Sequence, residues 1–235
     1  MRKKTALVTG GGRGIGLETA RLFVEQGIRT LIVDCNLDNL RAAKAELDSD
    51  LVEIYCADIT EEDKVNKLCE EILGKYGVVD ILINNAGIFR PDRGPFCESK
   101  SEHWRKKIDC NIYGTLYFTR ALINPMIEQK NGAIVNLCSV MADYGTPNMV
   151  DYSLTKGAIK SFTIALSKEV AEHNVRVNCV SPGNIEPDNR YPEMSYMNRS
   201  GSYRECAQVV CFLASEKASF VTGCNYTVDG GRKKI

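Results

Sequence analysis

Residues 9–16 of this chain read Thr9-Gly10-Gly11-Gly12-Arg13-Gly14-Ile15-Gly16, directly after the apolar run Ala6-Leu7-Val8. Glycines in such a turn let the backbone approach a pyrophosphate, and the free amides at the start of the following helix stabilise its charge. The spacing is Gly-x-x-x-Gly-x-Gly, which differs from the more familiar Gly-x-Gly-x-x-Gly. We therefore predict a dinucleotide-binding turn whose cofactor-binding residues are Gly10, Arg13, Gly14, Ile15 and Gly16.

Outward from this turn, short β-branched runs alternate with longer helical patterns. The further runs are Leu31–Val33, Val52–Tyr55, Ile81–Ile83, Ala133–Val135 and Val175–Val177. Alternation of this kind indicates repeated βα units and a parallel sheet flanked by helices. We predict one α/β domain over residues 1–235 with a doubly wound parallel sheet.

The boundaries of several helices are also visible in the sequence. Residues that tolerate the left-handed conformation precede four of the predicted strands: Gly27, Gly77, Gly132 and Asn174. Two pairs have the three-residue spacing with which a side chain caps the first amides of a helix: Thr60 with Asp63, and Ser99 with Glu102. The least regular stretch, at about 184–202, is predicted to be a substrate loop or lid.

The composition argues against several classes of protein. Thirty basic and thirty acidic side chains cancel, so nucleic acids and anionic membranes are not expected as partners. The ten cysteines are scattered without a Cys-x-x-Cys pair, and His103 lies far from His173, which predicts reduced thiols and no metal site. The apolar run Thr5–Thr9 is too short for a signal peptide or a membrane span, and we expect a cytoplasmic protein.

Asp34 ends the second predicted strand, about twenty residues after the glycine turn. A carboxylate at this place accepts hydrogen bonds from the adenosine ribose of NAD, whereas it repels the 2′-phosphate of NADP. At contact distance and an effective dielectric of about 20, this repulsion is about 4 kcal/mol per charge pair. Arg13 argues in the other direction, because its guanidinium could pair with that phosphate. On balance the residues favour NAD as the cofactor over NADP.

The ordered set of motifs resembles that of the classical short-chain dehydrogenase/reductase family over nearly the whole chain. Besides the glycine turn, the motifs are Asp58-Ile59, Asn84-Asn85-Ala86-Gly87, Asn111, Ser139, Tyr152-Ser153-Leu154-Thr155-Lys156, Pro182-Gly183-Asn184-Ile185 and Val228-Asp229-Gly230-Gly231. The resemblance, which includes the 3-oxoacyl-carrier-protein reductases of that family, implies a single-domain Rossmann fold with seven strands in the order 3-2-1-4-5-6-7. It also implies a homo-oligomer, either a tetramer or a dimer.

The resemblance further implies which residues surround the cofactor. It places Asp58 and Ile59 at the adenine, Asn84, Ala86 and Gly87 beside the dinucleotide, and Pro182, Gly183 and Ile185 at the nicotinamide, with Tyr152 and Lys156 also in contact. Relatives often have Thr where this chain has Pro187, and a proline lacks the backbone donor. We therefore expect the nicotinamide to be anchored differently here.

Tyr152 is the candidate for proton transfer. Hydride reduction of a ketone requires a proton for the developing alkoxide, oxidation of an alcohol requires a base, and a phenol can serve both purposes. The ordinary pKa of a phenol is about 10, so action as a base requires that the pKa is lowered. Lys156 supplies positive charge four residues later on the same helix face. By resemblance, Ser139 hydrogen-bonds the substrate oxygen, and Asn111 orders a water that leads to Lys156.

Two departures from the family concern the substrate. Many relatives have two serines where this chain has Cys138-Ser139, and only the second is expected to act. The loop at 184–202 is short, so we expect an open pocket whose contacts come from Asn189, Arg190, Tyr191 and Tyr196, with an ordinary surface loop as the alternative.

Taken together, these residues predict an NAD(H)-dependent oxidoreductase that interconverts a secondary alcohol and a ketone, with Tyr152 as general acid and base. The resemblance suggests small-molecule substrates such as 3-oxoacyl thioesters, hydroxysteroids, sugars or polyols, and the sequence does not choose among them. Two alternatives stay open: an NADPH-dependent 3-oxoacyl thioester reductase, and a non-catalytic dinucleotide-binding sensor on the same fold. Epimerases of the wider family are disfavoured by the short chain, which leaves no room for a separate sugar-binding domain.

Overall fold

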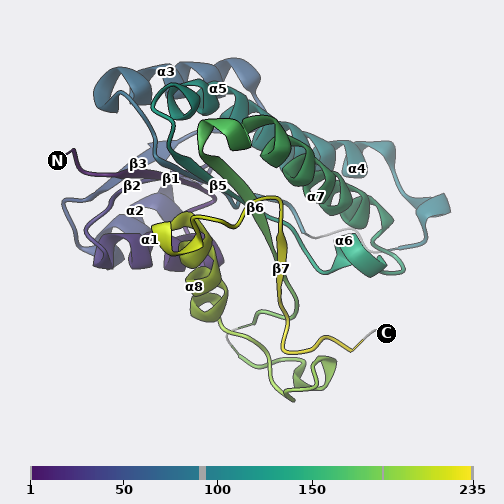
Figure 1. The fold of residues 1–235 in the computed structure, drawn as a ribbon. Helices are drawn as coiled ribbons and strands as arrows, with labels where there is room; N and C mark the ends of the chain where they lie inside the picture. The colour runs from purple at the N-terminus through teal and green to yellow at the C-terminus, as the bar shows by residue number, and fades with distance from the viewer. Residues whose placement is uncertain (1, 90–93, 187, 234–235) are drawn as a thin grey trace.

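The computed structural model describes residues 2–89, 94–186 and 188–233. At its centre lies a seven-stranded sheet in the order β3-β2-β1-β4-β5-β6-β7, in which every neighbouring pair is parallel (Figure 1). The strands are β1 (Thr5–Thr9), β2 (Arg29–Asp34), β3 (Val52–Cys56), β4 (Ile81–Asn84), β5 (Gly132–Leu137), β6 (Val175–Pro182) and β7 (Asn225–Val228). The predicted doubly wound parallel sheet is confirmed, together with its strand order.

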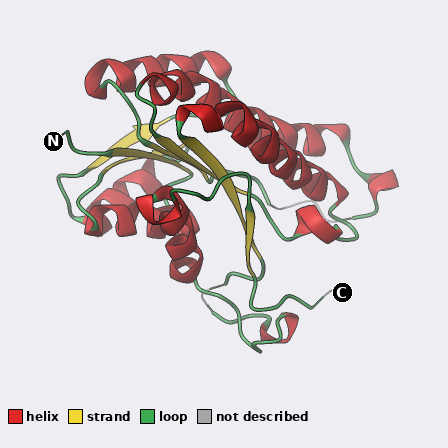
Figure 2. Cartoon of the chain, in the orientation of Figure 1, coloured by secondary structure: helices red, strands yellow, loops and turns green. Residues whose placement is uncertain are grey.

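Helices cover both faces of this sheet (Figures 1 and 2). The α-helices among the described residues are α1 (Gly14–Glu25), α2 (Leu37–Leu47), α3 (Glu62–Tyr76), α4 (Ser101–Ile108), α5 (Gly114–Glu128), α6 (Met141–Tyr144), α7 (Val150–Val170) and α8 (Tyr203–Ala214). Short 3-10 helices are η1 (Phe96–Glu98), η3 (Ala171–His173), η4 (Pro192–Met194) and η5 (Glu216–Ala218), and a π-helix, η2 (Asp109–Tyr113), joins α4 to α5.

Two apolar cores form, one on each face of the sheet. Helices α1, α2 and α8 bury their apolar residues on one face, and helices α3, α5 and α7 bury theirs on the other. Strands β1, β4 and β5 are buried along their whole length. Because both faces of these strands are covered, their sequences are nearly continuous apolar runs without a polar alternation.

The strand order positions the site. The chain passes from β1 through α1 to β2 on one side, whereas β4 lies on the other side of β1. In sheets of this kind, ligands bind in the crevice at the carboxyl ends of the strands where the order reverses. The glycine turn follows β1 at this edge, and the Asn84–Gly87 motif follows β4. The two predicted cofactor motifs therefore meet at one edge of the sheet.

Some predicted helix boundaries are confirmed and others are wrong. Gly27, Gly77 and Asn174 take φ angles of 73°, 75° and 55°, as expected for left-handed residues that end helices. Gly132, in contrast, is the first residue of β5. The left-handed residue of that connection is Lys130, with a φ of 52°.

The two predicted helix caps are also wrong. Thr60 donates from its amide and its hydroxyl to the Asp58 carboxylate, at 3.0 and 2.8 Å, one residue before the position that caps α3. Ser99 donates to the Phe96 carbonyl at 2.7 Å, and α4 begins without a side-chain cap. Both side chains stabilise local turns, which compete with capping for the same hydroxyl groups.

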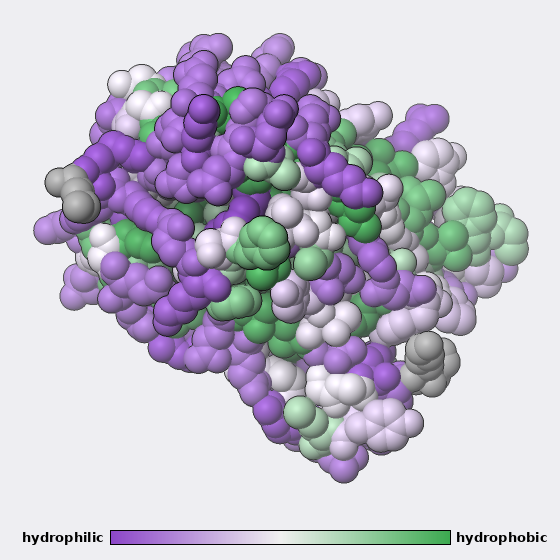
Figure 3. All heavy atoms as spheres, in the orientation of Figure 1, coloured by the Kyte–Doolittle hydropathy of each residue, from purple (hydrophilic) through white to green (hydrophobic). Residues whose placement is uncertain are grey.

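The surface is not uniform in polarity. In the view of Figure 3, hydrophilic side chains cover most of the layer formed by α3 and α5, and apolar side chains gather toward α4 and η1. The outer face of α7 exposes Val150, Leu154 and Ile164. No helix within the described ranges is both long enough and apolar enough to cross a membrane.

Candidate active site

The glycine turn is shaped for close approach by a ligand. Gly10 and Gly14 take φ angles of 63° and 60°, which favour glycine. A side chain on Gly16 would lie 2.2 Å from the Gly10 carbonyl oxygen, so no larger residue fits. Asn85 holds the turn from the β4 side by donating to the carbonyls of Thr9 and Gly10 at 3.0 and 2.9 Å. Helix α1 has no side-chain cap, so its first amides remain available to an anion.

The carboxyl end of β2 is acidic. Asp34 accepts from the Asn36 amide at 3.0 Å and from the Gly12 amide at 3.4 Å. Burial raises the pKa of the Cys35 thiol, and the charges of Asp34 and Asp58 raise it further. The carboxylates of Asp34 and Asp58 thus place negative charge where the sequence predicts the adenosine.

Two predicted cofactor residues turn their side chains into the core. Asn84 is 3% exposed and donates to the side chains of Thr119 and Asn136 at 3.0 and 2.9 Å. Asn136 in turn donates to Thr163 at 2.9 Å. Ile59 is buried in the core on the α3 and α5 side of the sheet. The amide and hydroxyl chain therefore joins β4 and β5 to α5 and α7 beneath the site, a structural role that the motif did not reveal.

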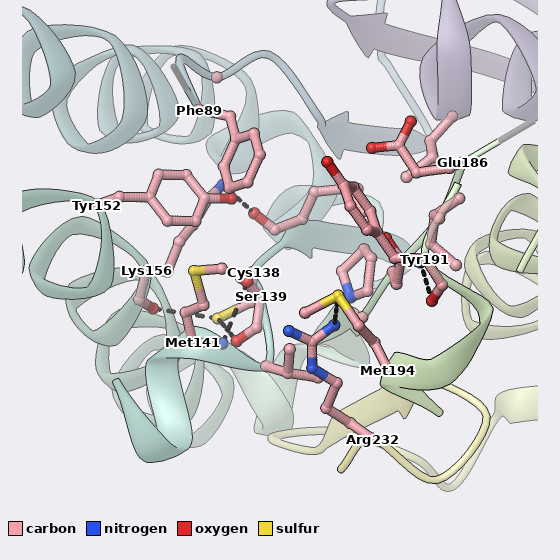
Figure 4. A pocket seen from close by; sticks show the side chains of 18 of the residues that line it. Phe89, Cys138, Ser139, Met141, Tyr152, Lys156, Glu186, Tyr191, Met194 and Arg232 are labelled. Atoms are coloured by element: carbon pink, nitrogen blue, oxygen red, sulfur yellow. Dashed lines mark hydrogen bonds between the residues drawn. The ribbon is translucent and has the colours of Figure 1, made fainter. Parts of the chain in front are cut away.

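A cavity of about 820 Å³ opens at the carboxyl edge of the sheet (Figure 4). The predicted site residues that line it are Ile15, Gly87, Ser139, Tyr152, Lys156, Pro182, Gly183 and Ile185. Figure 4 shows Tyr152, Lys156 and Ser139 together on one side of the cavity, with Tyr191 and Arg232 across from them. The structure thus brings three of the four candidate catalytic residues and the candidate nicotinamide residues to one cavity, which Asn111 does not line.

Tyr152 is a buried phenol. Its side chain is 8% exposed, and the Phe89 ring lies edge-on to it with 4.9 Å between the ring centroids. Burial raises the pKa of Tyr152, and a hydrogen bond with Ser139 acts in the opposite direction with a smaller effect. The Ser139 hydroxyl also accepts from the Met141 amide at 3.2 Å, which fixes its position. Tyr152 therefore holds its proton at neutral pH in this structure.

Lys156 lies one helical turn after Tyr152, as the spacing predicts. Its Nζ donates to the Leu137 carbonyl at 2.7 Å and lies 5.7 Å from the centroid of the Tyr152 ring. Burial lowers the pKa of Lys156. The expected lowering of the pKa of Tyr152 by Lys156 is therefore wrong for this structure, because the ammonium is directed to a carbonyl and the burial of the phenol has the larger effect. Cys138 donates to the Lys156 carbonyl at 3.1 Å and ties α7 to β5.

Asn111 lies in the π-helix η2, next to Gly87, and does not itself line the cavity. Its Nδ2 donates to the Ile88 carbonyl and to Thr155 Oγ1, both at 3.1 Å, and its Oδ1 accepts from the Ile88 amide at 2.7 Å. A side chain on Gly87 would approach Asn111 Oδ1 to 3.2 Å and Lys156 Nζ to 3.5 Å, so both polar groups flank that glycine. The sequence did not indicate the π-helix, a feature frequent at functional sites.

Tyr152 is held in position by a buried ion pair, which the sequence did not indicate. Lys107 on α4 contacts the Asp151 carboxylate at 2.5 Å, and the two side chains are 3% and 12% exposed. The other Asp151 oxygen accepts from the Tyr152 amide at 2.7 Å. The pair therefore joins α4 to the first turn of α7 directly beside the reacting phenol.

The loop at 184–202 is held by its own hydrogen bonds. Asn184 donates to the Tyr191 carbonyl at 3.1 Å and to the Ser200 hydroxyl at 2.7 Å, and Asn189 accepts from the Ser200 amide. Arg190 pairs with Asp188 at 2.9 Å. Pro187 lies outside the described residues.

Only one of the four residues that the sequence offered as substrate contacts lines the cavity, and that residue is Tyr191. Asn189 and Arg190 are occupied by the contacts within the loop. Tyr196 is 76% exposed and does not line the cavity. The prediction for these three residues is wrong, because their side chains serve the loop or face outward.

The chain segment after β7 closes the same side of the cavity. Ser195 and Arg232 form an antiparallel bridge, and the Lys233 amide donates to the Met194 carbonyl at 3.0 Å. Arg232, Lys233 and Met194 all line the cavity. Their place at the cavity was not visible in the sequence, because this pairing joins segments more than thirty residues apart.

Across the described residues, no group of three His, Cys, Asp or Glu side chains is arranged to hold a metal ion. The charged and polar side chains that line the cavity include the Ser139 hydroxyl, the Tyr152 phenol, the Lys156 ammonium, the Arg232 guanidinium and the carboxylates of Glu186 and Glu193.

Comparison with known proteins agrees with this geometry. The family model for short chain dehydrogenase matches residues 4–195. The 3-oxoacyl-[acyl-carrier-protein] reductase of Thermotoga maritima is 35% identical over 97% of both chains. Two solved structures superpose with TM-scores of 0.92: ElxO with NADP bound, at 29% identity over 97% of this chain and 98% of that one, and NAD⁺-bound xylitol dehydrogenase, at 31% over 98% and 99%. With the seven-stranded fold and the Ser-Tyr-Lys cavity, these matches show that the chain belongs to the short-chain dehydrogenase/reductase family of oxidoreductases, and that it is similar to its 3-oxoacyl-carrier-protein reductases.

Proposed function

We propose that this chain is an NAD(H)-dependent oxidoreductase that interconverts a secondary alcohol and a ketone, with Tyr152 as general acid and base. The observation that carries the proposal is the cavity in which Tyr152, Ser139 and Lys156 lie together next to the glycine turn. A hydroxyl, a phenol and a cation around one small volume are the groups that bind and protonate a carbonyl oxygen.

In this proposal the roles of the reacting residues follow from their contacts. Ser139, whose hydroxyl accepts from the Met141 amide, donates a hydrogen bond to the substrate oxygen. Tyr152, a protonated phenol in the buried site, gives its proton to the developing alkoxide during reduction and takes it back during oxidation. Lys156 and Asn111 flank Gly87 and supply positive charge and polar contacts behind the phenol.

The glycine turn fits a dinucleotide, because the turn excludes side chains and leaves the first amides of α1 uncapped. A bound nicotinamide dinucleotide would supply the hydride. The residues proposed to hold it are Gly10, Arg13, Gly14, Ile15, Gly16, Asp34, Asp58, Ala86, Gly87, Tyr152, Lys156, Pro182, Gly183 and Ile185. Asn84 and Ile59 would act through the main chain, because their side chains face the core.

NAD is the proposed cofactor on account of Asp34. Its carboxylate and that of Asp58 both raise the pKa of Cys35, so a 2′-phosphate placed there would meet two negative charges. The NAD⁺-bound xylitol dehydrogenase is compatible with this choice. Arg13, which precedes α1, is the one basic group at the turn, and the negative field of two carboxylates opposes its effect.

A second candidate is an NADPH-dependent reductase of 3-oxoacyl thioesters. The similarity to the reductase of Thermotoga maritima favours a 3-oxoacyl thioester as the substrate, and the similarity to NADP-bound ElxO favours NADPH as the cofactor. The two candidates differ in a measurable way, because the thioester reductase would consume NADPH faster than NADH.

The remaining proposals concern the setting of the enzyme. We take residues 1–235 as one catalytic domain that acts in the cytoplasm on small molecules. We also take it as a homo-oligomer, since the apolar residues Val150, Leu154 and Ile164 that α7 exposes are suited to contact with a second copy.

A substrate screen tests the function. The purified chain is mixed with NADH or NADPH and a panel of ketones that includes 3-oxoacyl thioesters, oxo acids, oxosteroids and keto sugars, and the absorbance of the reduced cofactor is followed. Turnover of one class with NADH supports the proposal. Turnover of thioesters with NADPH alone would favour the second candidate, and tight dinucleotide binding without turnover of any class would identify a sensor.

A further inference from the structure

Arg232 brings a guanidinium to the cavity without a carboxylate partner. A guanidinium offers five N–H donors in a planar fork and stays charged at physiological pH. Arg232 Nη1 donates to Met194 Sδ at 3.5 Å. The charge of Arg232 also lowers the pKa of Tyr144, against a larger rise that burial causes. Nε is buried and has no hydrogen-bond partner. A thioether is a weak acceptor, and among the described residues no carboxylate forms an ion pair with Arg232.

The position of Arg232 is fixed by main-chain pairing. Besides its bridge with Ser195, the tail is held by the Tyr196 amide, which donates to the Gly231 carbonyl at 2.9 Å, and by the Lys233 amide on Met194. These bonds hold the segment after β7 against the loop that bounds the cavity. The guanidinium is therefore presented by a fixed backbone on the side of the cavity that faces Ser139 and Tyr152 (Figure 4).

The acidic residues of the cavity do not neutralise Arg232. Glu186 and Glu193 also line it, and in the described part of the chain neither forms an ion pair with Arg232. Figure 4 shows Glu186 beyond Tyr191, away from the guanidinium. By contrast, Arg190 in the same loop has its own carboxylate, Asp188. Arg232 therefore differs from Arg190, because it has no carboxylate partner in an ion pair and its guanidinium is directed into the cavity.

We propose that Arg232 binds the carboxylate of the substrate and that the substrate is therefore a hydroxy acid, oxidised to the corresponding oxo acid. The inference rests on the proposed function of this cavity and names its substrate class. A carboxylate accepts two parallel hydrogen bonds from a guanidinium, which satisfies donors that the protein leaves free. The same substrate would place its hydroxyl or carbonyl carbon between Ser139 and Tyr152, on the opposite wall.

Other substrate classes leave the guanidinium unsatisfied. A sugar or polyol brings only neutral hydroxyls, and the carbonyl end of a 3-oxoacyl thioester is uncharged. Binding either one would bury a cation without an anion, which costs free energy. The chemistry of the cavity therefore favours a substrate with one negative charge at a fixed distance from the reacting carbon.

The experiment compares acids with their esters. The initial rate of NAD⁺ reduction is measured with 2-, 3- and 4-hydroxy acids and with the methyl ester of each, for the unmodified protein, Arg232→Gln and Arg232→Lys. For the best acid, Arg232→Gln is expected to lower kcat/KM roughly 10- to 100-fold, mainly through KM, while the ester changes less than about threefold. Arg232→Lys should recover part of the loss, because it keeps the charge. Arg190→Gln removes the same charge outside the cavity and should leave both rates unchanged.

A binding measurement separates failure of this inference from failure of the proposed function. Calorimetry with butyrate, an unreactive carboxylate, is performed on the protein saturated with NADH. Loss of butyrate affinity in Arg232→Gln by tenfold or more supports the anchor even without turnover. Equal butyrate affinity in both proteins, or equal loss for acid and ester, would overturn the inference while leaving the oxidoreductase proposal in place. Absence of turnover with every compound would count against the proposed oxidoreductase function and not against the binding of a carboxylate by Arg232.

Discussion

The choice between NAD and NADP can be tested by removing the charge of Asp34. In Asp34→Asn the side chain keeps one oxygen, which can accept from the Asn36 amide as Oδ1 does at 3.0 Å. The longer contact of the Gly12 amide with Oδ2, at 3.4 Å, is lost, so the turn should retain most of its shape. What changes is the field that a 2′-phosphate would meet. We therefore expect NADPH to bind more tightly and NADH to bind less tightly.

The magnitude follows from charge and distance. At about 4 Å and an effective dielectric of about 20, one charge pair contributes about 4 kcal/mol, and exposure and salt reduce this to about 2 kcal/mol. NADPH should therefore gain about thirtyfold in affinity. NADH should lose about fivefold, because a charged acceptor on the ribose hydroxyls is replaced by a neutral one, at a cost of about 1 kcal/mol.

Fluorescence titration with both reduced cofactors measures these affinities. Asp38→Asn is the matched control, because Asp38 is 91% exposed and pairs with Arg41 on the surface of α2. The control should shift neither affinity by more than about twofold. If Asp34→Asn alters both cofactors by the same factor, or if the unmodified protein already prefers NADPH, the reasoning about Asp34 is refuted.

Two further predictions concern the groups around the phenol. Lys107→Met leaves the Asp151 carboxylate buried without its partner, so the free energy of unfolding measured by urea denaturation should fall by about 3 kcal/mol. Adding Asp151→Leu should recover part of this loss. A loss below about 1 kcal/mol would contradict the burial of the ion pair. Because burial raises the pKa of Tyr152, the protein without cofactor should show no tyrosinate from this residue below pH of about 10. The ultraviolet difference titration against Tyr152→Phe checks this, and a step near neutral pH that the variant lacks would show that Lys156 or Ser139 outweighs burial.

Much of the fold was predictable because it depends on local signals. The glycine turn between an apolar run and a helix, repeated βα alternation, and left-handed residues such as Gly27 and Asn174 all act over short stretches of chain. Strand β7 left a weaker signal, because it is short and partly exposed at the edge of the sheet. The π-helix at Asp109–Tyr113 has no periodicity of its own that a sequence could display.

The candidate site was predictable where the spacing is helical and not where it depends on distant contacts. Tyr152 and Lys156 share a face because they are one turn apart on α7. The inward turn of Asn84 depends on partners from α5 and β5, which a motif does not show. The approach of Arg232 to the cavity depends on the pairing of the C-terminal segment with the loop near Ser195. Long-range pairing of this kind leaves no local pattern.

The central claim is that Tyr152 transfers the proton in a hydride reaction, and Tyr152→Phe tests it most directly. The phenylalanine keeps the ring that packs against Phe89 and removes only the hydroxyl. With a substrate identified by the screen, kcat is expected to fall by about 10²- to 10⁴-fold, while the affinity for NADH measured by fluorescence changes less than about threefold. A variant that binds NADH equally well and turns over at the unmodified rate would contradict the account.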